Sequence, residues 1–306
     1  MAGEGVQDLV RVAGNAGLDV LVRNVEEHNG PAMDAWGANV QFLEEPVEAT
    51  LGGGGAASAY LLGRLGQRVA LNTNLGKDSW GAVLLGFLEP AQVEVHQARA
   101  VVTAVDVILL SPEGKRHSLY YPGEKVDWKR SLEGEPPKWF LASGYGGVEA
   151  EDLEELRQVF AELRQKGTKI AFDPSPWFEG RVQTRDMLRV WSQVDCLVAT
   201  EEELSAWHQA PGPEELAVQL LEAGPEKVVV KRGKEGAVYA GRDEGVGSLA
   251  TEEVKNANSV GAGDTFNGRL LFGLCRGEGL EEAVAAAVHM ATRVVRRGRG
   301  VLGALD

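Results

Sequence analysis

The chain has 306 residues, 44% of them hydrophobic and 25% charged, which is typical of a globular protein built around one large α/β domain. Its formal net charge of −14 argues against nucleic acid or an anionic membrane as a partner. No apolar run reaches the length of a membrane span, and the first residues lack the basic-then-apolar order of a signal peptide. Cys196 and Cys275 lie far apart, so we expect neither a disulfide framework nor a cysteine zinc site, and we predict a cytoplasmic protein.

The first half of the chain alternates strand and helix signals before it changes character. Short strands are predicted at 9–12, 19–22 and 69–71, and a helix at 56–65. After residue 101, apolar residues alternate on either side of a Pro- and Gly-containing turn at 111–115, which predicts a β-hairpin. We expect this hairpin, together with strands from residues 20–50, to form a small β lid.

A regular alternation of strands and helices resumes after a helix predicted at 151–166. Strands are predicted at 169–172, 196–199 and 228–231, and a final helix with an apolar face at 281–296. Strands that alternate with helices indicate a mainly parallel sheet covered on both faces. In such sheets ligands bind beyond the carboxyl ends of the strands, where we expect the glycine-rich turns.

The segment Gly261-Ala262-Gly263-Asp264 carries the clearest chemical signal. It follows a β-prone region and opens an apolar run that reads as a helix. Glycines at a helix start let backbone amides converge on an anion, at the positive end of the helix dipole. A carboxylate beside a bound phosphate is unfavourable unless it accepts a proton, and phosphoryl transfer to an alcohol needs that pairing. The motif therefore predicts a kinase active site, although an ordinary glycine-rich turn with an aspartate cap has the same residues.

A second glycine cluster, Gly52 to Gly55, also precedes a predicted helix. Glycines between a strand and a helix suggest a dinucleotide site, but that motif needs a strand directly before it and an acidic residue closing the next strand. The segment before Gly52 is not a clear strand, and the strand at 69–71 is followed by Asn72. We therefore do not favour a dinucleotide-binding fold.

Five segments in the same order resemble the ribokinase-like carbohydrate kinase family over nearly the whole chain. Residues 52–59, 64–66 and 76–81 look like its N-terminal signature, and residues 258–268 look like its C-terminal signature. Thr103 with the hairpin and Tyr121-Pro122-Gly123 resembles its lid. Residues 196–204 and 228–236 resemble its Asn-x-x-Glu and Thr-x-Gly-x-x-Gly segments.

The resemblance implies a ribokinase-like α/β fold, a single kinase domain over residues 1–306 and a β lid from parts of about 20–50 and 98–125. It implies an ATP-dependent kinase that phosphorylates a hydroxyl of a sugar or sugar-like molecule. Asp264 would be the base, amides of Gly261, Ala262 and Gly263 the anion hole, and Glu203 would hold Mg²⁺, usually through water. The implied nucleotide contacts are Thr200, Glu203, Lys231, Gly233, Gly236 and Asn258. The implied acceptor contacts are Asp19, Gly53 and Gly54, and Asn15 is a further candidate from this chain's own sequence.

The chain departs from the family pattern on the acceptor side. Gly17 and Ala57 replace two asparagines that commonly contact a sugar, so the acceptor remains a sugar, a sugar acid or a nucleoside. We expect Asn15, Asn39 or Gln41 to compensate. Two of the implied roles also have simpler explanations, because Asp19 suits the end of a strand and Glu203 a solvated helix start.

On the nucleotide side Thr200 stands for an asparagine and Lys231 for a threonine. Lys231 suits either a phosphate contact or a solvent-exposed strand end. Arg269 stands where a small residue is usual. ATP and Mg²⁺ are the expected cofactors, and a monovalent cation is left open.

Two other functions stay open at this point. One is a nucleoside kinase of the same fold, and the other is a non-catalytic protein that binds a sugar or nucleotide. The partner is in each case a small molecule. We also predict a homodimer through the β lid, because an apolar hairpin face in so small an appendage needs to be covered.

Overall fold

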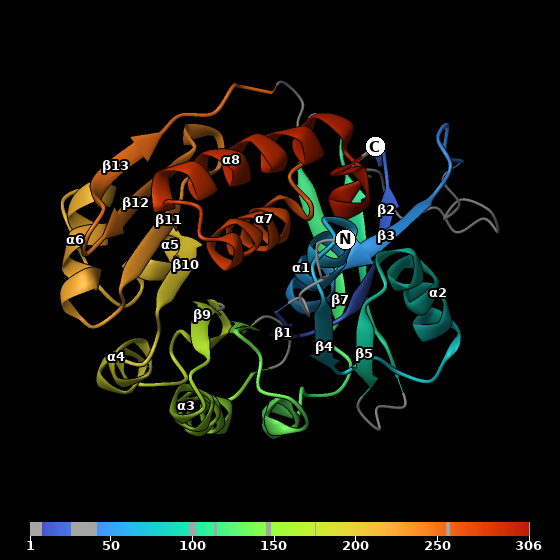
Figure 1. Cartoon of the computed structure of the whole chain (residues 1–306). Coiled ribbons are helices and arrows are strands. Elements are labelled where there is room, and N and C mark those ends of the chain that lie inside the picture. The colour runs from blue at the N-terminus through green and yellow to red at the C-terminus, as the bar shows by residue number, and fades with distance from the viewer. Residues whose placement is uncertain are drawn as a thin grey trace, which may run out of the picture.

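The structure is a computed structural model of the chain that describes residues 8–25, 42–97, 102–112, 115–144, 148–174, 176–254 and 258–305. Within these residues the largest element is a nine-stranded sheet in the order β13-β12-β11-β10-β9-β8-β1-β4-β5 (Figure 1). The strands from β11 to β5 in this order are parallel, and β12 and β13 continue the sheet antiparallel. Their bounds are β1 Val10–Ala13, β4 Val69–Thr73, β5 Glu94–Gln97, β8 Trp139–Ser143, β9 Lys169–Asp173, β10 Cys196–Thr200, β11 Lys227–Lys231, β12 Ala237–Gly241 and β13 Gly245–Leu249.

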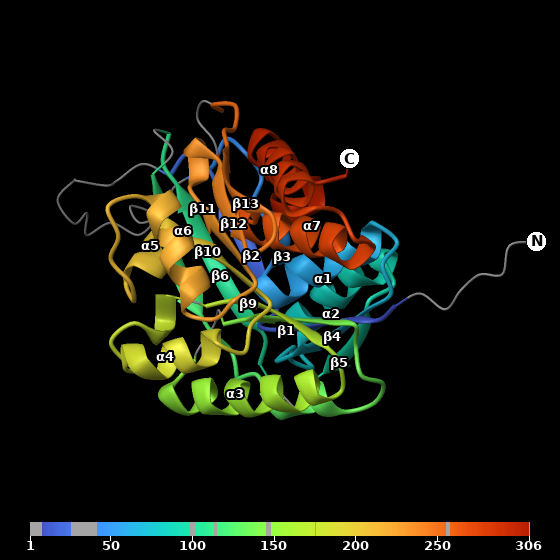
Figure 2. The same ribbon diagram turned by 60° about the vertical axis from the view of Figure 1, so that its left-hand side comes forward.

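Helices cover both faces of this sheet, as Figure 2 shows. One layer holds α1 (Gly54–Arg64), α2 (Ser79–Leu88), α7 (Ala262–Arg276) and α8 (Leu280–Arg297). The other holds α3 (Ala150–Gln165), α4 (Thr184–Trp191), α5 (Glu201–Ser205) and α6 (Pro213–Glu222). Short 3₁₀ turns are η1 Glu89–Ala91, η2 Trp128–Leu132, η3 Pro176–Phe178, η4 Gly233–Glu235 and η5 Gly300–Gly303.

The near-continuous apolar strands follow from this two-sided burial. Along β11, Val229 packs in the core under α1, α7 and α8, whereas Val228 and Val230 pack in the core under α3, α4 and α6. Successive side chains of a strand point to opposite faces, so a strand covered on both faces must be apolar throughout. The predicted mainly parallel α/β sheet is confirmed.

Phe160 of α3 lies at the centre of the second core. Its ring makes edge-on contacts with Phe140 of β8 and Phe172 of β9, at centroid distances of 6.1 and 5.5 Å. Replacing it (Phe160→Ala) removes a fully buried ring and leaves a cavity between helix and sheet. We expect the free energy of unfolding to fall by about 3–5 kcal/mol, measured by urea denaturation with an unchanged m-value. A loss below 1 kcal/mol would show that the site collapses around the smaller side chain.

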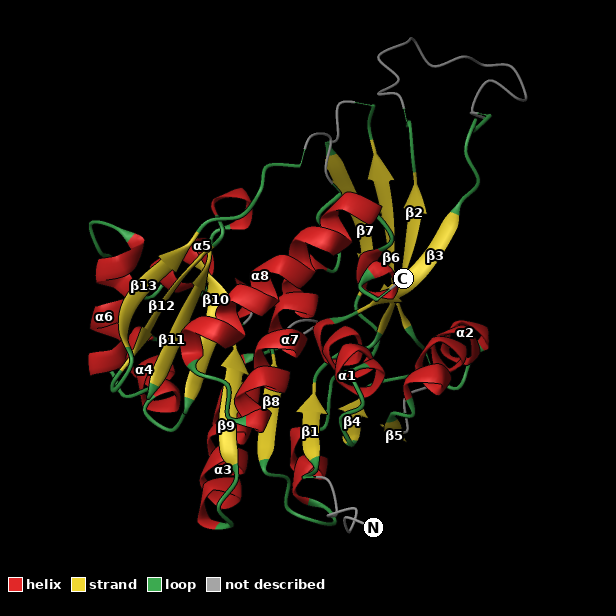
Figure 3. Ribbon diagram, turned by 45° about the horizontal axis from the view of Figure 1, so that its top comes forward, coloured by secondary structure: helices red, strands yellow, loops and turns green. Residues whose placement is uncertain are grey.

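A separate four-stranded sheet, called the small sheet here, stands beyond the carboxyl ends of β1 and β8 (Figure 3). Its order is β3-β2-β6-β7, with bounds Glu48–Gly52, Gly17–Val22, Ala104–Leu110 and Arg116–Tyr121. β6 and β7 form the antiparallel hairpin that the sequence predicted, and β2 pairs parallel to β6. On one face Asp19, Asp106 and Tyr120 are neighbours across the strands.

One expectation is wrong: the segment before the second glycine cluster is a strand, β3. It pairs antiparallel with β2 in the small sheet and crosses into α1 through Gly53, whose φ is 84°. The strand, glycine and helix therefore do not form a parallel unit of the main sheet, which is what a dinucleotide fold requires. Among the described residues, no helix is long and apolar enough to cross a membrane.

Candidate active site

Asp264 lies in the first turn of α7, three residues after its N-cap Gly261. Gly261 has a φ of 74° and packs against Gly300 and Val301, so a side chain there would be strained and would meet backbone. Burial raises the pKa of the Asp264 carboxyl, and nearby Lys231 opposes that rise. A carboxyl whose pKa is moved upward, toward the working pH, suits a general base.

The amides around Asp264 are only partly available. Ala262 N donates to Ser259 O at 3.1 Å. Gly263 N belongs to the first turn, where a helix supplies no acceptor of its own. The turn therefore presents Gly263 to a ligand most directly, and Gly263 is also the exposed member of the motif.

A cavity of about 380 Å³ opens beside this turn. It brings together six residues expected from the sequence: Thr200, Lys231, Gly233, Gly236, Ala262 and Gly263. Its wall is largely apolar and includes Phe266 of α7 and three residues of α8, namely Val288, Ala291 and Val295. Apolar walls with a few polar groups at one end suit a nucleotide base and its phosphates.

The sequence did not reveal that side chains of α8 line this cavity. Val288, Ala291 and Val295 belong to the same apolar stripe as Val284, which is fully buried in the core. An apolar helix face has the same spacing whether it packs on a sheet or lines a cavity. Only the fold separates the two.

Lys231 ends β11 and is buried with two partners. Its Nζ donates to Asp173 Oδ2 at 3.1 Å and to Asn267 Oδ1 at 3.3 Å, and Asn267 Nδ2 also donates to Asp173 Oδ2. Burial alone would lower the pKa of Lys231, but Asp173 and other carboxylates raise it overall, so the ammonium stays charged. Its Nζ lies 3.8 Å from the place where a Cβ on Gly263 would sit, between the cavity and the anion-hole turn. The lysine therefore does not point into solvent.

Glu203 closes the start of α5 by a capping box with Thr200. Glu203 Oε2 accepts from Thr200 N at 2.8 Å, and Thr200 Oγ1 accepts from Glu203 N at 3.2 Å. The carboxylate is 8% exposed, so it is not a solvated helix start. Its charge raises the pKa of Asp173 and of Asp264, which places it within electrostatic reach of both. Such oxygen donors suit Mg²⁺, which keeps waters and takes one or two carboxylates.

On the other side of Asp264 lie the residues expected to bind the acceptor. A Cβ on Gly54 would sit 3.2 Å from Asp264 Oδ1, and the same atom would collide with Ser143 Oγ at the end of β8. A Cβ on Gly52 would collide with the Asp19 carboxyl. Glycine is therefore required at both places for the two carboxylates to approach the start of α1.

Asn15 connects this region to the small sheet. Asn15 Oδ1 accepts from Gly54 N at 3.1 Å, and Asn15 Nδ2 donates to Tyr120 Oη at 3.2 Å. Tyr120 in turn lies 6.4 Å from the ring of Trp177 in η3. The amide of Asn15 thus takes part in the site, whereas Gly17 and Ala57 offer no polar side chain there. Asn39 and Gln41 lie outside the described residues.

A family profile described as pfkB family carbohydrate kinase matches residues 20–303. The chain belongs to this family. It is 27% identical to ribokinase of Mus musculus over 72% of this chain and 70% of the relative. It is 25% identical to 5-dehydro-2-deoxygluconokinase of Shouchella clausii over 96% of this chain and 91% of that relative. It is 26% identical to cytidine kinase of Thermococcus kodakarensis over 81% of this chain and 89% of that relative.

Solved structures share the fold. A ribokinase of Arabidopsis thaliana with ribose and ATP aligns at a TM-score of 0.75 and 18% identity, covering 97% of this chain and 96% of the other. The phosphofructokinase-2 of Escherichia coli with potassium aligns at a TM-score of 0.75 and 20% identity. The alignment covers 98% of this chain and 97% of the other. The fold is therefore ribokinase-like. As a member of the pfkB family, the chain is a phosphotransferase that uses ATP and has an alcohol acceptor.

Asn258, which was expected to contact the nucleotide, and Arg269, whose direction the sequence left open, do not line this cavity. Asn258 lies in the turn before α7, where Asn258 Oδ1 accepts from Val260 N at 3.1 Å, and it does not line the cavity of about 380 Å³. Arg269 pairs with Glu278 through two contacts of 3.0 and 3.1 Å and lies over the ring of Phe272. The long side chain of Arg269 is 14% exposed and reaches Glu278, just beyond the end of α7.

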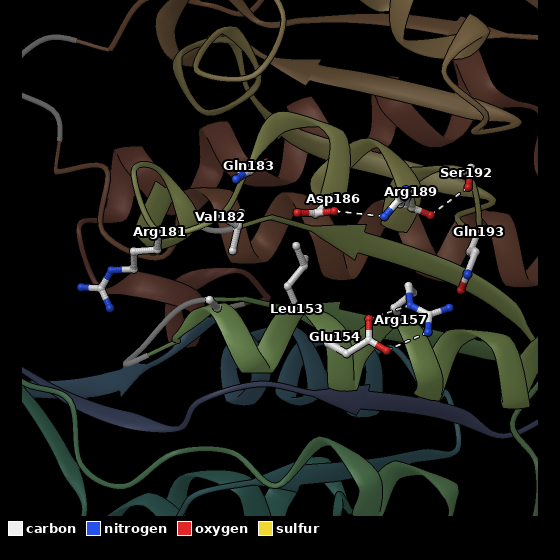
Figure 4. A pocket seen from close by; sticks show the side chains of 11 residues that line it. Leu153, Glu154, Arg157, Arg181, Val182, Gln183, Asp186, Arg189, Ser192 and Gln193 are labelled. Atoms are coloured by element: carbon white, nitrogen blue, oxygen red, sulfur yellow. Dashed lines mark hydrogen bonds and ion pairs between the residues drawn. The ribbon is translucent and has the colours of Figure 1, made fainter.

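A larger hollow of about 750 Å³ lies between α3 and α4, away from Asp264. Figure 4 shows that its charged side chains pair locally, Arg157 with Glu154 and Arg189 with Asp186. These ion pairs are exposed, and in each the two side chains belong to the same helix and contact each other. They therefore offer little binding energy for a charged ligand. The hollow has none of the pfkB kinase features described above.

Asp19 is predicted to make the folding stability of this kinase depend on pH. Burial raises the pKa of its carboxyl from 3.8 to about 8, and the charges of Asp106 and Asp264 add to that rise. Because the folded state holds the proton more tightly, its contribution to stability is full below pH 3.8 and is lost as pH rises toward 8. We expect Asp19→Asn to lose this dependence, so the variant gains stability relative to wild type between pH 5 and 8, as seen in melting temperatures. Parallel curves for the two proteins over that range would contradict the assignment.

Proposed function

We propose that the chain phosphorylates a hydroxyl of a sugar, with Asp264 as the general base and the cavity beside Lys231 as the Mg-ATP site. One observation carries the proposal: the Asp264 carboxyl lies between Gly54, on the acceptor side, and the cavity lined by Gly263 and Lys231. A base placed between the acceptor and the transferring phosphate is the arrangement that phosphoryl transfer requires.

In the proposed reaction each of a few residues has a separate role. Asp19 and Asn15 orient the acceptor, and Asp264 takes the proton of the hydroxyl as its oxygen forms the bond to the γ-phosphorus. The bond from that phosphorus to the bridging oxygen of ADP breaks at the same centre. Gly263 N and the Lys231 ammonium stabilise the phosphoryl oxygens. Glu203 would hold Mg²⁺, which would neutralise phosphate charge when bound.

A sugar is the first candidate for the acceptor because ribokinase and 5-dehydro-2-deoxygluconokinase are among the relatives. A nucleoside is the second, supported by cytidine kinase. We expect a panel of sugars, sugar acids and nucleosides, assayed for ADP release with Mg-ATP, to give product with a sugar. Turnover of nucleosides alone would move the assignment to the second candidate.

A non-catalytic binder is the remaining alternative. It is disfavoured because Asp264 and the anion-hole glycines are all present in the described site. Melting temperatures measured with Mg-ATP and each acceptor separate the two functions. Stabilisation by a ligand that is never converted over long incubation would support the binder.

The small sheet is proposed to act as a lid and to mediate a homodimer. Its face opposite Asp19 is apolar and partly uncovered: Leu119 is 56% exposed and Tyr121 51%, and they lie beside Val107 and Val105 of β6. A second copy of the same face would cover it, as an isologous dimer requires. Light scattering at several concentrations should give twice the chain mass, and Leu119→Glu should give the monomer. A wild-type monomer at all concentrations would exclude the dimer.

A cytoplasmic location is proposed on the basis of the two cysteines, which are both buried and unpaired. Use of a monovalent cation is supported only by the solved relative with potassium. This chain can bind such an ion only if carbonyl oxygens near the anion-hole turn are free to coordinate it.

A further inference from the structure

Arg23, just after strand β2 of the small sheet, reaches the end of helix α8. Its Nη2 donates to Gly298 O at 2.9 Å, and its Nη1 pairs with Glu48 Oε2 at 2.8 Å. The Arg23 side chain is 21% exposed, and 275 positions separate Arg23 from Gly298 in the chain. Gly298 is the C-cap of α8, with a φ of 64°. The last carbonyls of a helix carry partial negative charge, so a cation is favoured there.

The same carbonyl is tied to the turn that opens α7. Asn258 Nδ2 donates to Gly298 O at 3.4 Å, while Asn258 Oδ1 accepts from Val260 N at 3.1 Å. Val260 packs against Leu21 of β2 and Ile108 of β6. Gly298 O therefore joins the small sheet to the residues directly before the anion-hole glycines.

The next carbonyl is also occupied by a protein donor. Thr50 Oγ1 of β3 donates to Arg299 O at 2.9 Å. Gly300 follows, and its Cα lies 3.1 Å from where a Cβ on Gly261 would sit. Two successive carbonyls at the end of α8, those of Gly298 and Arg299, thus accept from Arg23 directly after β2 and from Thr50 of β3.

Backbone carbonyl oxygens such as these are the kind of ligand that a monovalent cation takes. Hard cations take backbone and side-chain oxygens, several at once. Here Gly298 O accepts from a guanidinium and an amide, and Arg299 O accepts from a hydroxyl. A cation at Gly298 O would also lie against the positive charge of Arg23. The donor set therefore does not fit a bound monovalent cation at this place.

We propose that Arg23 acts as a built-in cation that positions the anion-hole turn, so that this kinase works without an added monovalent cation. The inference rests on the proposed kinase function. Arg23 touches no reacting atom. It neutralises the end of α8, fixes Gly298 O and through Asn258 holds the turn at Gly261. Misplacement of that turn by a fraction of an ångström weakens the contacts to the transferring phosphate.

The test compares wild type with Arg23→Ala and a matched control. Arg181→Ala is the control, because Arg181 has the same kind of partners, a backbone carbonyl (Val148 O, 2.8 Å) and a glutamate (Glu149, 3.1 Å), but lies at the remote hollow. Rates are measured at constant ionic strength with choline chloride, and then with potassium chloride or guanidinium chloride at millimolar concentration in its place. Arg23→Lys is included because it keeps the charge and one donor.

We expect wild type and Arg181→Ala to change less than about twofold on exchange of choline for potassium. Arg23→Ala should lose about tenfold to a hundredfold in kcat with little change in the KM for ATP, in line with a misplaced catalytic turn. Added potassium or guanidinium should restore part of the lost rate, and Arg23→Lys should be less affected. A merely structural arginine would give a loss that no added cation restores, which would overturn the proposal, as would a wild-type enzyme that needs potassium.

A second readout does not depend on turnover. The melting temperature of each protein is measured in choline and potassium chloride of equal concentration. Arg23→Ala should gain a potassium-specific stabilisation that wild type and Arg181→Ala lack, because a cation that binds only the folded state raises its stability. Failure of wild type to phosphorylate any acceptor would count against the proposed function, whereas this shift tests Arg23 by itself. Equal melting behaviour of wild type and Arg23→Ala in both salts would overturn the cation role.

Discussion

Asp264→Asn should lower kcat by at least ~100-fold, the usual contribution of a general base, with the KM for ATP little changed. The amide keeps the shape and the position in the first turn of α7 but cannot accept the proton. The backbone carbonyl of Asp264, which accepts from Ser58 Oγ at 3.1 Å, is unaffected by the change. Steady-state rates with saturating Mg-ATP and the acceptor found by the panel measure the effect.

The pH dependence gives a second check on the same residue. Because burial raises the pKa of Asp264, the wild-type rate should fall as the pH drops through that raised value, and the residual rate of the variant should not. Asp186→Asn, whose side chain lies 40% exposed on α4, serves as a surface control and should keep the wild-type rate. A variant at position 264 with near-normal turnover would assign the base to another group.

The sequence predicted the reaction better than the contacts that support it. Gly261 to Asp264 could be placed at a helix start because glycines followed by an apolar run leave few other structures. Strand β11 and helix α3 were predicted almost to the residue, since their periodicity is strong and their ends are marked by glycine and charge. These features are local, and local patterns are visible in a sequence.

The remaining features depend on residues far apart in the chain. Strand β3 is short and carries a glutamate, an alanine and a glycine, which are disfavoured in strands, so its β character comes from pairing with β2 rather than from its own composition. Val288 belongs to the core and also lines the cavity beside Lys231, which its spacing alone does not reveal. The partners of Lys231 lie 58 and 36 positions away, and Gly298 lies 275 positions from Arg23. No spacing rule reaches across such distances, and only the fold brings these groups together.

Variants of the buried pair Lys231 and Asp173 can show whether Lys231 contributes to stability, to catalysis or to both. Lys231→Met leaves the Asp173 carboxyl buried without its cation, and breaking such a pair costs about 3–5 kcal/mol. Burial raises the pKa of Asp173 from 3.8 to about 7 even with Lys231 present, and removal of the lysine raises it further. At low pH the carboxyl is protonated in both proteins, so the loss should be small there and grow as the pH rises above 7. Urea denaturation at several pH values measures it.

The double variant Lys231→Met with Asp173→Asn decides what the lysine does. Neither side chain is then charged, so most of the lost stability should return, since replacing both partners of a buried pair is far less costly than removing one. If the ammonium stabilises the transferring phosphate, kcat should remain low in the double variant although the fold is restored. Recovery of both stability and rate would instead show that Lys231 serves only to neutralise Asp173, and that Gly263 N and the metal-bound phosphates suffice for transfer.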